Sequence, residues 1–293
     1  MSSDGHFVSV VVPTLGRGTL DQCRQALERQ IRPADEIVLV VDEERRGASW
    51  ARSEGFRRSR GDLIVFTDDD CVPPPEWLGS LLEAIVNHDA AAAGGSQREC
   101  DPLLADIRGR RPLPERTQVD PGGLVGNTAN VMYRRDWLSR LLERDGYLFH
   151  QSFPTSGEDW ELAGRLHQMG AKMVYVPVHV EHLRQASPWN HCKHQFVRGI
   201  GIAYLARAAR LRGPGFAVQK SMLWGADNGS FGLKWLRLIW HKVVGPFDVG
   251  SFRSLSHFGW FWLGEKFQGA GYLWAQIRFA GGAASTDALV GKP

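Results

Sequence analysis

The sequence has few cysteines, and no two of them lie at a short spacing. The four that it contains are widely separated, at Cys23, Cys71, Cys100 and Cys192. A disulfide framework or a zinc finger needs cysteines at short, regular spacings, so we exclude both. The pattern suits a protein of the reducing cytosol.

Long hydrophobic runs are also missing. The apolar stretch near the N-terminus spans only residues 7–12, and Asp4 stands where a secretory signal needs basic charge. The longest uncharged segments of the tail, residues 254–264 and 267–277, fall well below the roughly 18 apolar residues that indicate a membrane-spanning helix. We therefore expect a cytoplasmic chain with no export signal and no transmembrane helix.

The glycine fingerprint of dinucleotide-binding enzymes is absent too. The stretch 16–21 ends on Asp21 and the stretch 199–204 ends on Tyr204, where the fingerprint requires Gly or Ala. A redox enzyme with a nicotinamide or flavin dinucleotide is therefore set aside.

The charge of the chain is divided unevenly. The 293 residues are 43% hydrophobic and include 11 Trp, which fits one large core or two modest ones. Residues 1–183 carry 21 Lys and Arg against 28 Asp and Glu, net −7, and residues 184–293 carry 14 against 4, net +10. Of the seven tryptophans in the basic part, six lie beyond residue 220: Trp224, Trp235, Trp240, Trp260, Trp262 and Trp274.

A basic, aromatic tail has two interpretations that remain open. It fits an amphipathic segment on an anionic membrane surface, which would make the protein peripheral on the inner face of the cell membrane. It equally fits a helical subdomain packed on the core or on a second subunit. Single-stranded nucleic acid also attracts such residues, but no nucleic-acid-binding motif accompanies them, so we expect no nucleic-acid partner.

Apolar runs rich in β-branched residues alternate with amphipathic stretches along the first third of the chain. We predict strands at residues 7–12, 36–41 and 62–67 and helices at residues 20–29, 48–59 and 76–87. This order is typical of an α/β fold with a mostly parallel, Rossmann-like sheet flanked by helices. Ligands bind such sheets beyond the carboxyl ends of the strands.

The later part of the chain is less regular. Residues 90–120 lose periodicity, so we expect an exposed loop there that helps to shape the site. Beyond it we predict helices at residues 134–143 and 160–168 and a strand at residues 171–177.

Three consecutive aspartates follow the third strand. In an extended segment alternate side chains share a face, so Asp68 and Asp70 would converge while Asp69 points away. Two carboxylates with water and phosphate oxygens form a hard oxygen site that suits Mg²⁺ or Mn²⁺. The alternative is an acidic turn that favours the dipole of the following helix.

Five segments, in this order, resemble the family 2 glycosyltransferases, which have the GT-A fold. They are VSVVVPTLGR, EIVLVVD, GASWARSEGFRRSRGDLIVFTDDDCVPPPEWL, GNTANVMYRRDWL and SGEDWELAGRL. The resemblance implies a catalytic GT-A domain in residues 1–205 that binds a nucleotide-sugar. Residues 206–293 would then be a C-terminal helical extension that is basic and rich in aromatics.

The resemblance also assigns roles to matching residues. The donor would contact Pro13, Thr14, Asp42, Arg52, Asp68, Asp69, Gly126, Asn127 and Glu158. Asn130 would line the same region. Where the family usually has a second acidic residue and then small ones, this chain has Glu43, Glu44 and Arg45. That departure leaves the base open, although we expect a UDP-sugar.

The metal and the catalytic base come from the same resemblance. Asp70 and Asp68 would hold Mn²⁺ or Mg²⁺ together with His182, with His179 as the alternative histidine. Zinc is disfavoured, because the histidines around Cys192 have no regular ligand spacing.

Asp159 matches the general base of inverting members, which takes the proton of an acceptor hydroxyl as its oxygen attacks the anomeric carbon. From residue types alone, Asp159 also fits a capping box with Ser156. Both roles can coexist at one helix start.

We therefore expect a metal-dependent, inverting transfer of one sugar to a hydroxyl of a glycan, glycolipid or small molecule. Gly199 replaces the Trp of the Gln-x-x-Arg-Trp signature of processive members, which favours single transfer. A sugar nucleotidyltransferase and a non-catalytic binding module on a membrane surface are the alternatives.

Overall fold

The computed structural model describes residues 5–108, 114–120, 125–153, 156–185, 187–213, 215–216 and 255–280. Its strands are β1 Val8–Thr14, β2 Glu36–Val41, β3 Leu63–Phe66, β4 Cys71–Val72, β5 Ala92–Glu99, β6 Gln118–Val119, β7 Val131–Arg134 and β8 Met173–His182. Its helices are α1 Leu20–Glu28, α2 Ala48–Arg58, α3 Trp77–His88, α4 Pro102–Arg108, α5 Arg135–Asp145, α6 Glu158–Gln168, α7 Pro188–Arg212 and α9 Leu255–Ala280.

The strands form one mixed sheet in the order β2-β1-β3-β7-β5-β8-β4, with β6 paired to β8. Strands β2, β1 and β3 are parallel to one another, and so are β5 and β8. Strand β7 is antiparallel to both of its neighbours, and β4 is antiparallel to β8. The predicted mostly parallel sheet flanked by helices is confirmed.

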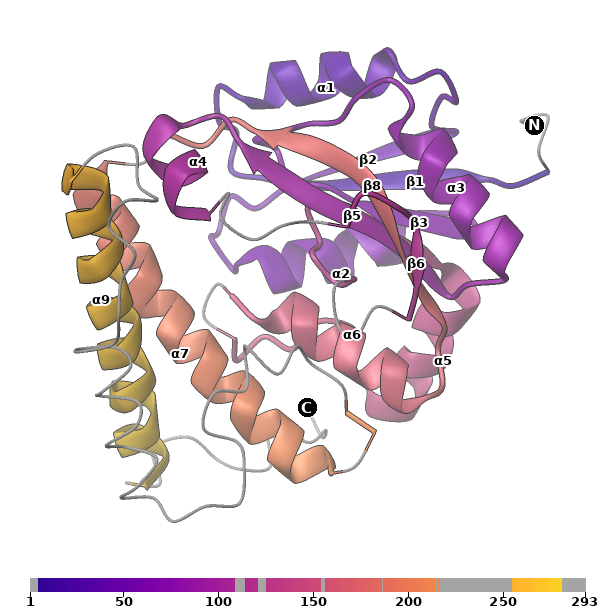
Figure 1. Ribbon diagram of the computed structural model, residues 1–293. Coiled ribbons are helices and arrows are strands. Elements are labelled where there is room, and N and C mark those ends of the chain that lie inside the picture. The colour runs from indigo at the N-terminus through magenta and orange to yellow at the C-terminus, as the bar shows by residue number, and fades with distance from the viewer. Residues whose placement is uncertain are drawn as a thin grey trace.

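Helices cover both faces of this sheet, α1 and α3 on one side and α2, α5 and α6 on the other (Figure 1). Strand β3 is buried along its whole length, and β1 nearly so. One cluster of buried residues includes Trp77 and Leu81 of α3, and the other includes Phe56 of α2 and Leu162 of α6. Burial on both faces explains the continuous apolar runs of the central strands, because neither face meets water.

The expectation of an irregular loop over residues 90–120 is wrong. Strand β5 and helix α4 lie within it, and residues 109–113 lie outside the described part. The first half of strand β5 is Ala and Gly, which are rare in strands, and the second half is polar, so its sequence gives no strand signal. The small residues are needed for close packing: a Cβ on Gly94 would come within 2.9 Å of the Asn130 carbonyl oxygen, and one on Gly95 would meet the Val178 carbonyl oxygen.

Helices α7 and α9 pack side by side at one edge of the molecule (Figure 1). Glycines permit this approach, because a Cβ on Gly199 would meet the Gln268 carbonyl and one on Gly271 would meet the Phe196 carbonyl. Residue 205, where we expect the catalytic domain to end, lies within α7. Among the described helices, none is both long enough and apolar enough to cross a bilayer.

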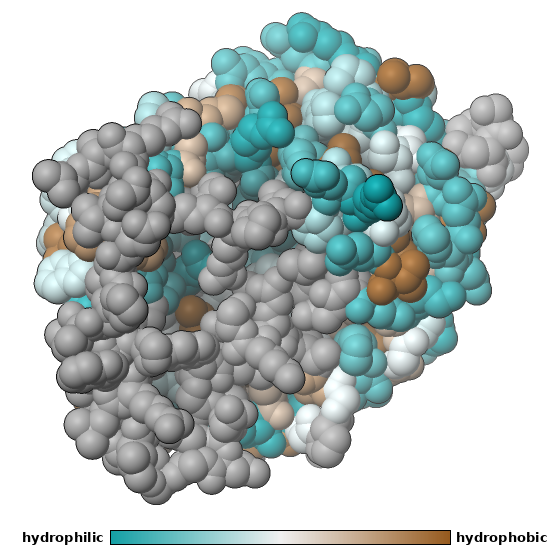
Figure 2. Space-filling view, viewed as in Figure 1, coloured by the Kyte–Doolittle hydropathy of each residue, from teal (hydrophilic) through white to brown (hydrophobic). Residues whose placement is uncertain are grey.

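Half of the tail tryptophans can be placed. Trp224, Trp235 and Trp240 lie outside the described residues. On α9, Trp262 and Trp274 are partly exposed, with Lys266 and Arg278 over their rings at 4.6 and 4.8 Å. On the face drawn in Figure 2, the described residues are mainly hydrophilic, and hydrophobic ones form small separate groups.

Candidate active site

A cleft of about 2030 Å³ opens at the carboxyl ends of the parallel strands, with α7 and α9 contributing to its wall. Most of the residues that the sequence predicts for the site line it: Pro13, Thr14, Asp42, Arg52, Asp68, Asp69, Asp70, Asn127, Glu158, Asp159, His179 and His182. The fold therefore brings together groups from β1, β2, α2, the β3–β4 turn, α6 and β8, as expected for this edge of such a sheet.

The three aspartates are arranged differently from the expectation. Strand β3 ends at Phe66, and residues 68–71 form a turn in which the Cys71 N–H donates to the Asp68 carbonyl at 3.1 Å. The segment is therefore not extended, and Asp69 does not point away from Asp70 as expected. Instead, one guanidinium nitrogen of Arg17 lies 3.3 Å from both Asp69 and Asp70.

Each aspartate has a positive or hydrogen-donating partner, which offsets their mutual repulsion. The Thr14 hydroxyl donates to Asp69 at 2.6 Å and accepts from the Gly16 N–H at 2.9 Å, so Asp69 also holds the loop after β1. Arg52 donates to Asp68 at 2.8 Å. Asp70 faces His182 as well as Arg17.

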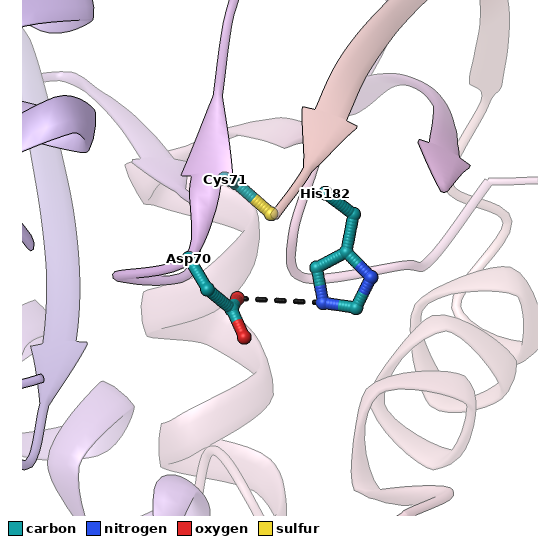
Figure 3. Close-up of side chains that lie close together, drawn as sticks. All are labelled: Asp70, Cys71 and His182. Atoms are coloured by element: carbon teal, nitrogen blue, oxygen red, sulfur yellow. Dashed lines mark ion pairs between the residues drawn. The ribbon is translucent and has the colours of Figure 1, made fainter. Parts of the chain in front are cut away.

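The group best placed to hold a metal ion consists of Asp70, Cys71 and His182, with ligand atoms all within 4.8 Å of one another (Figure 3). The antiparallel pairing of β4 with β8 puts Cys71 opposite His182. His182 Nε2 lies 3.4 Å from Asp70 Oδ1. His179 lies elsewhere, with its Nδ1 against the Ser96 hydroxyl.

Electrostatics separate the members of this group. Burial raises the pKa of Asp70, but His182 and the charge of Arg17 outweigh it, so the pKa is lowered. Burial lowers the pKa of His182, yet hydrogen bonds to Asp70 and Glu99 raise it to about 9. Burial raises the pKa of the Cys71 thiol well above its ordinary value. Asp70 and His182 line the cleft and offer a carboxylate and an imidazole to a cation such as Mn²⁺, whereas Cys71 does not line it.

Arg52 of α2 joins two parts of the site. Its guanidinium donates to Asp68 at 2.8 Å and to Glu158 of α6 at 2.8 Å. Arg52 and Glu158 are each 5% exposed. Burial by itself lowers the pKa of Arg52, but the charges of Asp68 and Glu158 outweigh it and raise the pKa.

Asp159 is the second residue of α6, which begins two residues earlier than predicted. Gly157 is the N-cap, with φ 103°, and no side chain caps the helix, so the capping box with Ser156 does not form. Asp159 accepts the Trp160 N–H at 2.9 Å. Burial and then the charge of Glu158 raise the pKa of Asp159 to about 7, although Arg52 opposes them. A carboxyl that titrates near neutrality suits a general base.

The remaining predicted contacts have structural partners. Both oxygens of Asp42 accept backbone N–H groups, from Arg46 at 2.9 Å and Gly47 at 2.7 Å, which shapes the loop after β2. Asn127 donates to Gln97 at 3.0 Å. Gly126 has a φ of 152° and packs against Trp160 and Ala163.

Asn130 is fully buried. Its side-chain oxygen accepts the Trp77 indole N–H, and its side-chain nitrogen donates to the carbonyls of Ser96 and Val178. It therefore connects strands inside the core and does not line the cleft.

Sequence reasoning missed three residues. Arg17 was not considered, and Glu99 was taken as part of a loop. Glu99 lies at the carboxyl end of β5, where ligands bind such sheets, so recognising this strand would have identified Glu99 as a site residue. Tyr133 has a fully buried hydroxyl with no hydrogen-bond partner among the described residues. Burial and then the charge of Asp159 raise its pKa.

Comparisons with known proteins find similarity to glycosyltransferases. The model of glycosyl transferase family 2 matches residues 17–142. A glucosyl-dolichyl phosphate glucuronosyltransferase of Haloferax volcanii is 36% identical over 128 residues, which cover 39% of this chain and 38% of that protein. The low-salt glycan biosynthesis hexosyltransferase Agl6 of the same organism is 26% identical over 250 residues, which cover 72% of this chain and 56% of that protein.

A solved structure matches over nearly the whole chain. The mannosyltransferase PcManGT of Pyrobaculum calidifontis, in complex with GDP-Man and Mn²⁺, has a TM-score of 0.61 and 16% identity. The match covers 92% of this chain and 87% of that one, and it establishes a shared fold. Residues 17–142 of this chain are therefore similar to glycosyl transferase family 2, and the chain shares the GT-A fold of that mannosyltransferase.

Proposed function

We propose that this protein is a metal-dependent, inverting glycosyltransferase that moves one sugar from a nucleotide-sugar to an acceptor hydroxyl. The observation that carries the proposal is the meeting of two chemically distinct groups in one cleft. Asp159 is a carboxyl with a pKa near 7, and Asp70 faces His182 in an arrangement that suits a divalent cation.

In the proposed reaction Asp159 takes the proton from the acceptor O–H. The freed oxygen forms a bond to the anomeric carbon, and the bond from that carbon to the diphosphate oxygen breaks, with the electron pair leaving on the diphosphate. A cation held by Asp70 and His182, with Asp68 as a further candidate ligand, would stabilise charge on the leaving diphosphate. Arg52 donates hydrogen bonds to both Asp68 and Glu158 and so holds these carboxylates beside the reacting groups.

For the donor and the acceptor we propose a chemical class only. A UDP-sugar is our expected donor, while the similar structure holds GDP-Man. Relatives named for dolichyl phosphate sugars favour a lipid-linked acceptor. The basic aromatic surface of α9 would suit an anionic membrane carrying such an acceptor.

The direct test is a thermal-shift panel of UDP, GDP, dTDP and CDP, each with and without Mn²⁺. A ligand at about a hundred times its dissociation constant should stabilise the fold by roughly 2.7 kcal/mol. We expect one diphosphate to raise the melting temperature only with Mn²⁺, and Asp70→Ala to lose the effect. If no diphosphate shifts the wild type, the proposal fails. Release of pyrophosphate from a nucleoside triphosphate would favour the nucleotidyltransferase instead.

The rate of transfer should depend on pH through Asp159. A base works only when deprotonated, so at saturating Mn²⁺ kcat/KM should fall about tenfold per pH unit below pH about 7. Glu158→Gln removes the adjacent negative charge, which lowers the pKa of Asp159. The fall of kcat/KM, the acidic limb of the pH profile, should therefore move to lower pH. Glu143→Gln, on the exposed face of α5, is the control and should leave the limb in place. An unmoved limb in Glu158→Gln would contradict the assignment.

A further inference from the structure

We propose that Glu99 is a positioning residue of the metal site, which fixes the orientation and tautomer of His182 so that Nε2 faces the cation. The inference rests on the proposed function, because it requires that Asp70 and His182 hold a metal ion. It deepens that function by adding a residue that would not itself touch the metal.

The contact between the two side chains is short and shielded from water. Glu99 Oε2 lies 2.7 Å from His182 Nδ1. The side chain of Glu99 is 4% exposed and that of His182 is 8% exposed. On the other side of the ring, Nε2 lies 3.4 Å from Asp70 Oδ1. The imidazole therefore stands between two carboxylates, one buried behind it and one facing the cleft.

An irregularity in the sheet creates this contact. Strands β5 and β8 pair in parallel, with Gly94 opposite Tyr175 but Ser96 opposite His179. If the first register continued, Glu99 would face Val180. The bulge adds two residues to β8 and puts His182 opposite Glu99. Bulges often redirect side chains beside active sites.

The bulge has a sequence origin. Pro177 lies in the extra segment of β8, where its missing N–H costs no ladder hydrogen bond. On the opposite strand, Gly95 leaves room for the displaced backbone, because a Cβ there would meet the Val178 carbonyl.

The chemistry explains why a carboxylate at this position matters. An ionised carboxylate accepts hydrogen bonds and donates none, so it selects the form of His182 that carries a proton on Nδ1. A metal ion at Nε2 would displace the proton there, and the Nε2 lone pair would then bind the metal. A carboxylate behind a ligating histidine also makes the ring a stronger ligand, and removing such a partner typically lowers metal affinity by about 10- to 100-fold.

The test measures Mn²⁺ affinity directly, by electron paramagnetic resonance of free Mn²⁺ with the full chain and no nucleotide. Glu99→Gln should weaken binding by about 10- to 100-fold relative to wild type. Glu181→Gln is the matched control, since Glu181 is the exposed neighbour of His182 and loses the same charge. It should bind Mn²⁺ as the wild type does.

A double-mutant cycle separates positioning from a structural role. In a His182→Ala background, Glu99→Gln should cause no further loss of affinity, because the ring it orients is gone. An equal loss in both backgrounds would overturn the proposal, and so would wild-type affinity in Glu99→Gln. If Glu99→Gln does not fold, Glu99→Asp replaces it with the same comparison.

The two levels of inference fail in different ways. If the wild-type protein does not bind Mn²⁺, the metal-dependent function fails and the role of Glu99 fails with it. If the wild type binds and Asp70→Ala does not, while Glu99→Gln binds normally, only the role of Glu99 is overturned.

Discussion

Asp159→Asn is expected to lower the rate of sugar transfer by about 10²- to 10⁴-fold, the usual contribution of a general base. The substitution keeps the size of the side chain, and its amide oxygen can still accept the Trp160 N–H. It removes the property of Asp159 that the mechanism uses, a carboxylate that takes a proton near neutral pH. Donor binding should change little, because the groups proposed to hold the donor and the metal remain in place.

The measurement is single-turnover transfer at saturating donor, with donor affinity determined separately by calorimetry. Asp136→Asn is a close control: Asp136 is the second residue of α5, as Asp159 is of α6, but it is exposed and pairs with Arg140 at 2.9 Å. It should leave transfer unchanged. Retained turnover in Asp159→Asn would remove this residue from the role of base.

Arg52→Met should destabilise the fold by about 3–5 kcal/mol, the usual cost of breaking a buried ion pair by removing one partner. The substitution leaves Glu158 buried without its cation. Asp68 loses a partner as well, but its side chain is 29% exposed, so water compensates part of that loss. The effect is therefore expected to come mainly from Glu158.

Urea denaturation at neutral pH measures this change. Arg57→Met is the matched control on the same helix, because Arg57 is 72% exposed in its pair with Glu54. An ion pair exposed to water contributes little to stability, so the control should be close to wild type. Adding Glu158→Gln to Arg52→Met should recover part of the stability, since no buried charge then remains at that position. Equal midpoints for Arg52→Met and wild type would show that the pair contributes nothing.

Arg52 connects stability with function. It ties α2 and the end of β3, which belong to the proposed donor half of the cleft, to the start of α6, which carries Asp159. A variant that breaks this connection is expected to misplace the base relative to the donor. Rates for such variants therefore need to be compared at temperatures where the protein remains folded.

The periodic part of the fold could be predicted from the sequence because its signals are local. The predicted helices 20–29, 48–59 and 76–87 correspond to α1, α2 and α3 within one residue at each end. Apolar runs also mark β1, β2 and β3. Strands β1 and β3 are buried, which excludes most polar residues, whereas β2 is a partly exposed edge strand. The resemblance to family 2, carried by motifs at these elements, is confirmed by the family match and by the fold.

The prediction failed where a local pattern was ambiguous or missing. Strand β5 has no strand signal, because close backbone contacts at Gly94 and Gly95 require small residues. The expectation that Asp69 points away from Asp70 was wrong, because the strand ends before the aspartates and gives way to a turn in which both contact Arg17.

The sequence by itself determined the fold class, the order of the first elements, the resemblance to family 2 and most of the predicted residues at the cleft. The tertiary structure alone decided which of them meet. Arg52 reaches Glu158 across 106 positions of the chain, and Glu99 reaches His182 through a bulge in β8. Such contacts depend on sheet order and register between distant strands, and the local periodicity that reveals single elements carries no information about either.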